Sequence, residues 1–64
     1  MEEILLEADA IKQLLDGVKL RVNALRYACD AADAEDAAYC ARNACDHIAA
    51  ALDALEDFCF EAQT

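Results

Sequence analysis

Apolar side chains recur at alternating steps of four and three residues along almost the whole chain. In the first half this repeat defines what we call the first seam: Ile4, Ala8, Ile11, Leu15, Val18, Val22, Leu25, Cys29 and Ala32. The spacing keeps an apolar stripe on one side of a helix and is typical of coiled-coil packing. The chain has no proline and one glycine, so little opposes long helices. The sequence therefore predicts an all-α fold.

The single glycine, Gly17, lies off the first seam, and the seam continues past it in phase. We therefore expect Gly17 to be accommodated inside one helix, at a cost of about 1 kcal/mol relative to alanine. A break at Gly17 is the structural alternative, and it would give a compact monomer of three helices.

The second half has an apolar repeat of its own, which we call the second seam: Ala38, Ala41, Cys45, Ile48, Leu52, Leu55, Cys59 and Ala62. Continuing the first seam in phase would instead bring polar residues into the core, among them Asp36 and Asp46. One uninterrupted helix cannot bury both seams, so the pattern predicts a turn at about residues 30–36. Asp33 is the expected cap of the second helix.

The simplest architecture is an antiparallel helical hairpin with helices at about residues 3–31 and 34–62, in one domain that spans 1–64. A chain of 64 residues encloses a small core, and a pair of helices leaves part of each apolar face open. We therefore expect two chains to form a dimeric four-helix bundle.

Negative charge is concentrated in the second half. Residues 33–64 contain eight acidic side chains and one basic one, a balance of −7, whereas residues 1–32 contain six and four, a balance of −2. On a helical wheel most of the excess lies opposite the second seam and defines what we call the acidic face: Glu35, Asp36, Asp46, Asp53, Asp57 and Glu61. Solvation of an alanine-rich bundle is the simpler interpretation. The asymmetry between the helices supports binding of a basic partner.

The first helix has a mixed outer surface, made of Lys12, Lys19, Leu20, Asn23, Arg26 and Tyr27. Its apolar members are expected to contact another subunit or a third helix. Its basic members are spaced so that they could follow the phosphates of a nucleic acid, but a net charge of −9 repels a polyanion. Direct binding of nucleic acid is therefore disfavoured.

In length, in its hairpin plan and in an acidic turn followed by Cys40, six residues after Ala34, the chain resembles the small plasmid-encoded Rop family. The resemblance implies a dimeric four-helix bundle that binds RNA through its first helices. It covers the overall plan alone, and no motif transfers residue by residue.

The four cysteines, Cys29, Cys40, Cys45 and Cys59, are separated by intervals of 11, 5 and 14, so no CxxC pair for zinc is present. We expect free thiols, with Cys29, Cys45 and Cys59 acting as small buried apolar residues. A Cys29–Cys40 disulfide across the turn is the alternative. No metal or cofactor is expected.

Groups suited to catalysis are scarce. The chain has no serine, and its one histidine, His47, points away from the neighbouring Asp46 on a helix. We therefore expect no enzymatic activity. No apolar run approaches the length of a membrane span, and the acidic start lacks the basic segment of a signal peptide, so the cytoplasm is the expected location.

The main functional hypothesis is a non-enzymatic interaction protein whose acidic face binds a basic surface of another protein. Its sharper form is an inhibitor that mimics nucleic acid, since small acidic phage-encoded inhibitors, many anti-CRISPR proteins among them, resemble this chain in size and charge. Such an inhibitor would associate more slowly as salt rises. The alternatives are an assembly hairpin that works through its apolar surface and a Rop-like RNA-binding hairpin.

Overall fold

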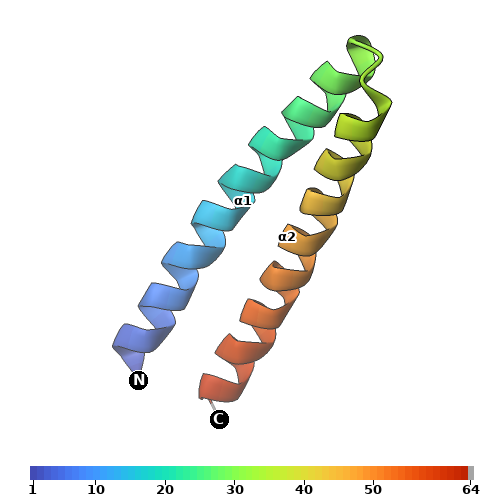
Figure 1. The fold of residues 1–64 in the computed structure, drawn as a ribbon. Helices are drawn as coiled ribbons and strands as arrows, with labels where there is room; N and C mark the ends of the chain where they lie inside the picture. The colour runs from blue at the N-terminus through green and yellow to red at the C-terminus, as the bar shows by residue number, and fades with distance from the viewer. Residues whose placement is uncertain (64) are drawn as a thin grey trace.

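The computed structural model describes residues 1–63, which form two helices, α1 (Glu2–Ala31) and α2 (Glu35–Gln63). The helices lie side by side in opposite directions, so the start of α1 and the end of α2 are at the same end of the molecule (Figure 1). The predicted all-α antiparallel hairpin is confirmed. The alternative of a break at Gly17 is wrong, because α1 continues through this residue.

The turn is set by the end of α1, where Asp33 has a positive φ of 58°. Around this residue the Ala34 N–H donates a hydrogen bond to the Cys29 carbonyl, with an N···O distance of 2.9 Å. The Asp33 N–H donates to the Asp30 carbonyl at 3.2 Å, which completes a Schellman motif. The expectation that Asp33 caps α2 is therefore wrong. Ala34 takes the cap position, since its carbonyl accepts the first helical bond from the Ala38 N–H.

The second seam forms the side of α2 that contacts α1. Ala38 is 4% exposed, and the other seven residues of the second seam are all half-buried. The predicted orientation of this helix is therefore confirmed along its whole length.

The first seam contacts α2 through only half of its members. Ala8 is buried, and Leu15, Val22 and Cys29 are half-buried at seven-residue intervals. The other members within α1 are between 38% and 61% exposed: Ile4, Ile11, Val18 and Leu25. The row on the opposite flank, at residues 5, 12, 19 and 26, has three half-buried members, Leu5, Lys12 and Arg26, and Lys19 is exposed.

This rotation of α1 leaves half of the first seam within the helix exposed, in line with the expectation that a pair of helices leaves part of each apolar face open. A single neighbouring helix covers a strip narrower than the apolar face of α1, so one flank is left outside. The flank that α2 covers carries Lys12 and Arg26, whose long aliphatic stems bury apolar area.

The hairpin alone has almost no interior. Within residues 1–63 the buried apolar side chains are Ala8 and Ala38, each 4% exposed, and no large side chain is fully buried. The Cα atoms span 48 × 15 × 9 Å, the dimensions of a thin rod. Neither helix of the described chain carries an apolar stretch long enough to cross a membrane.

Candidate interaction surfaces

The acidic face is exposed on the outer side of α2. All six of its residues are exposed, and they are spread over residues 35–61 of α2. This range corresponds to about 39 Å of helix at 1.5 Å per residue. Because the second seam occupies the side of α2 that meets α1, the acidic face points away from α1.

Two members of the acidic face have a local structural role. Glu35 and Asp36 occupy the first turn of α2, where the positive end of the helix dipole favours negative charge. Asp46, Asp53 and Asp57 lie farther along the helix, and no ion pair or hydrogen bond within residues 1–63 engages their carboxylates. These three carboxylates are therefore available to a partner.

Exposed aromatic side chains accompany the acidic face. Tyr39 is 62% exposed and Phe60 is 67% exposed. With Asp46 and Asp53 between them, they form a row at seven-residue intervals along α2. Tyrosine, in particular, often contributes strongly to protein–protein binding. This row was not predicted from the sequence, although its seven-residue spacing was the signal that could have revealed it.

The mixed outer surface of α1 is divided between different sides of the helix. Leu20 and Tyr27 are 73% and 60% exposed. Lys12, Asn23 and Arg26 are instead half-buried. The set was predicted to form one outer surface, but the rotation of α1 turns Lys12, Asn23 and Arg26 partly toward α2 and leaves Leu20 and Tyr27 outside.

The basic members of that surface have contacts inside the hairpin. Lys12 Nζ lies 3.7 Å from Asp9 Oδ1. The guanidinium carbon of Arg26 lies 5.3 Å from the centroid of the Tyr27 ring, and its Nε is buried with no hydrogen-bond partner in the described chain. Lys19 is exposed, and its carbonyl accepts a long hydrogen bond from the Cys45 thiol, with an S···O distance of 4.0 Å.

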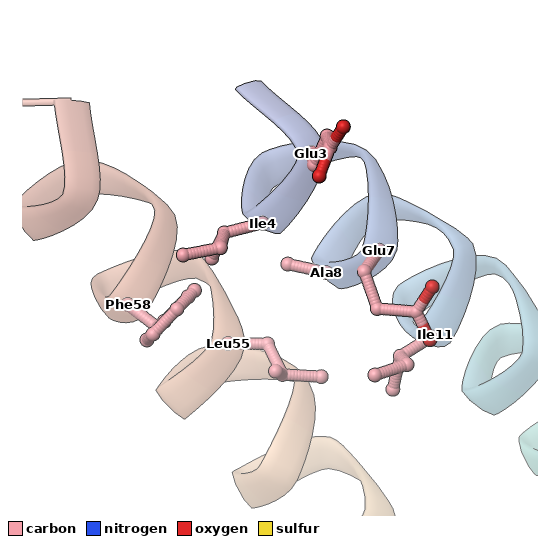
Figure 2. A pocket seen from close by; sticks show the side chains of 7 residues that line it. All are labelled: Glu3, Ile4, Glu7, Ala8, Ile11, Leu55 and Phe58. Carbon is pink, nitrogen blue, oxygen red and sulfur yellow. The ribbon is translucent and has the colours of Figure 1, made fainter. Parts of the chain in front are cut away.

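A third surface is apolar and lies along one broad side of the hairpin. We call it the open face: Ile4, Ile11, Val18 and Leu25 of α1 with Ala37, Ala44, Ala51 and Phe58 of α2. Near the end away from the turn it contains a hollow of about 340 Å³, lined by Glu3, Ile4, Glu7, Ala8, Ile11, Leu55 and Phe58. Figure 2 shows Ile4 pointing toward Phe58 across the space between the helices. Neither row of the open face contains a charged residue.

The cysteine and histidine side chains differ in exposure. All four cysteines are free thiols, with Cys40 exposed and the other three half-buried. His47 is exposed on α2. Among residues 1–63 no group of three or more histidine, cysteine, aspartate and glutamate side chains is placed to hold a metal ion.

No family model, no curated protein and no solved structure matches this chain. Its function is therefore inferred from its surfaces. A thin hairpin with an acidic outer side and an apolar open face is suited to non-covalent binding of other macromolecules, by charge on one surface and by burial of apolar area on the other.

Proposed function

We propose that this protein is a non-enzymatic interaction protein whose acidic face binds a basic surface of another protein. The observation that carries the proposal is the exposure of six acidic residues along one side of α2. Three of them, at Asp46, Asp53 and Asp57, have no role in holding the hairpin together. Long-range attraction would speed association and would weaken as salt rises.

The sharper form of the proposal is mimicry of nucleic acid, as an inhibitor of the anti-CRISPR type. The support is linear geometry: the acidic face is a straight array of carboxylates along a helix. Its six charges over about 39 Å give one charge per roughly 6–8 Å. A single DNA strand carries one charge per about 3.4 Å, so one hairpin offers a sparser array than the strand it would replace.

The test is competition for a basic partner. The immobilised protein is incubated with a host lysate at low salt, and bound proteins are eluted with duplex DNA. We expect basic nucleic-acid-binding proteins to be retained and then released by the DNA. We also expect retention to be lost when Asp46, Asp53 and Asp57 are all changed to Asn, because three carboxylates at the centre of the contact are neutralised.

The matched control is a second triple variant, Glu3→Gln, Asp16→Asn and Asp30→Asn, which removes the same charge from α1 and leaves the acidic face intact. This control variant should retain the same proteins as the wild type. Equal loss in both triple variants would mean that net charge, and no particular surface, determines binding. Retention that ignores both the α2 substitutions and the competing DNA would refute the proposal.

A second candidate function is assembly, in which the apolar surface is the one that matters. The exposure of Ile4, Ile11, Val18 and Leu25 favours it, since large apolar side chains in one row are typical of a contact surface. The two candidates make opposite predictions for charge reversal at Asp46, Asp53 and Asp57. An assembly hairpin keeps its activity after this change, whereas an acidic interaction protein loses it.

A further inference from the structure

We infer that the open face is covered by a second copy of this chain, in a four-helix bundle whose two-fold axis is perpendicular to the helices and passes close to Leu14. The inference builds on the expected dimer and adds the face, the symmetry axis and the contacts. It does not depend on which partner the acidic face binds.

The area left exposed by the hairpin matches what a second copy would cover. The accessible surface of the described chain is 4889 Å². A folded monomer with the chain's mass of 7.0 kDa is expected to expose roughly 4,000 Å². The excess of roughly 900 Å² is close to the ~800 Å² that each partner buries in an interface of standard size.

The distribution of charge identifies which broad side is covered. The open face has no charged residue in either of its rows. The other broad side carries Lys12 and Arg26 on α1 at the boundary with α2. Burying that side would desolvate these charges, whereas burying the open face removes apolar side chains from water.

The direction of the two-fold axis follows from charges at the edge of the open face. Glu7, Leu14 and Arg21 form a row at seven-residue intervals, and Glu7 lines the hollow in the open face. When two copies of α1 pack antiparallel about Leu14, Glu7 of each copy faces Arg21 of the other. The row is therefore complementary to itself.

The alternative two-fold axis, parallel to the helices, is disfavoured by the same charges. It would place α1 against α2 of the second copy. The contact between the Lys19 carbonyl and the Cys45 thiol fixes the relative height of the two helices. At that height Glu7 lies within about one turn of Glu61, which lies near Phe58 at the edge of the open face, so like charges would meet.

The perpendicular axis also brings a suitable side chain to the hollow. Leu25 is 61% exposed in the single hairpin. Antiparallel pairing about Leu14 places Leu25 of the second copy level with Glu3, at the hollow formed with Ile4 and Phe58. On α2 the same axis passes near residue 50, so it brings Ala51 of the two copies close together, and this small side chain allows the helices to approach closely.

The test is the mass in solution by sedimentation equilibrium, compared for two leucine variants. The wild type should sediment at twice the chain mass of 7.0 kDa. Leu25→Glu should raise the dimer dissociation constant by about a hundredfold or more, because a carboxylate would be buried in the apolar contact. At concentrations where the Leu25→Glu variant is still dimeric, its helix content should equal that of the wild type. Leu20→Glu is the matched control, at a leucine that is 73% exposed on a different side of α1, and it should remain dimeric.

A charge swap tests the register. Glu7→Arg and Arg21→Glu should each weaken the dimer, by about threefold to tenfold, and the double variant should restore it. The inference would be overturned if the wild type is monomeric or if the Leu25→Glu variant remains a dimer. It would also be overturned if Leu20→Glu weakens the dimer as much as Leu25→Glu, or if the double charge variant forms a weaker dimer than both single variants. None of these variants changes the acidic face. A negative result for the dimer would therefore leave the proposed binding of a basic partner to be tested separately.

Discussion

At the scale of single residues, the hairpin depends on one backbone conformation at the end of α1. Asp33 adopts the left-handed region, with a φ of 58°, and the two hydrogen bonds of the Schellman motif form around it. The left-handed region costs most side chains about 1–2 kcal/mol per residue, and aspartate visits it more readily than most. Glycine has no such cost, which makes this position the clearest place to test the turn.

We predict that Asp33→Gly is more stable than Asp33→Ala by about 1 kcal/mol in the free energy of unfolding, measured by urea titration at one protein concentration. Both variants lose the same carboxylate, so the comparison isolates the backbone conformation. Equal stability of the two variants would contradict the left-handed turn at Asp33.

The sequence pattern predicted the position of the turn but not the conformation of Asp33. The loss of phase between the first seam and the second seam located the turn, because polar residues such as Asp36 could not enter a core. The role of Asp33 could not be read in the same way. Aspartate is common both as a helix cap and in left-handed turns, and the choice depends on where α1 ends.

At the scale of the helices, α1 is continuous over Glu2–Ala31 although Gly17 lies at its middle. A Cβ added at Gly17 would meet no atom within 4 Å. No close contact within the hairpin therefore requires glycine at this position, and the backbone freedom of Gly17 lowers the stability of the helix.

We predict that Gly17→Ala raises the free energy of unfolding by about 0.5–1 kcal/mol, because alanine restricts the unfolded chain and favours helix. The matched control is Ala24→Gly, an exposed site one heptad farther along α1, which should lower stability by a similar amount. If Gly17→Ala is destabilising in the same urea measurement, then Gly17 has a contact or a bend that the continuous helix lacks.

The rotation of α1 shows where sequence patterns stop being sufficient. The second seam could be predicted completely, since all of its residues are buried or half-buried on the side of α2 that meets α1. The first seam marks a face wider than one helix can cover, and its spacing does not say which flank α2 takes. That choice depends on packing between particular side chains, including the stems of Lys12 and Arg26.

At the scale of the whole molecule, the inferred dimer would change the acidic face. A two-fold axis perpendicular to the helices sets α2 beside α2 of the second copy and points both acidic faces to the same side of the bundle. Two arrays of six carboxylates over about 39 Å give one charge per roughly 3–4 Å, close to the spacing in one strand of DNA. The apolar contact and the charged surface would thus support one function.

Composition pointed to the acidic face, and the structure places its residues in solvent. The open face was beyond sequence reasoning, because it depends on which side of each helix remains uncovered. The acidic face does not identify one particular partner, since many basic surfaces are complementary to a linear acidic array.

The most direct measurement of the central claim is displacement of DNA from a basic protein that the acidic face retains. Fluorescence anisotropy follows labelled duplex DNA bound to the purified partner as this protein is added. We predict that the wild type releases the DNA at low salt, less effectively at high salt, and that the Asp46→Asn, Asp53→Asn, Asp57→Asn variant does not. DNA that remains bound while this protein joins the complex would contradict the account.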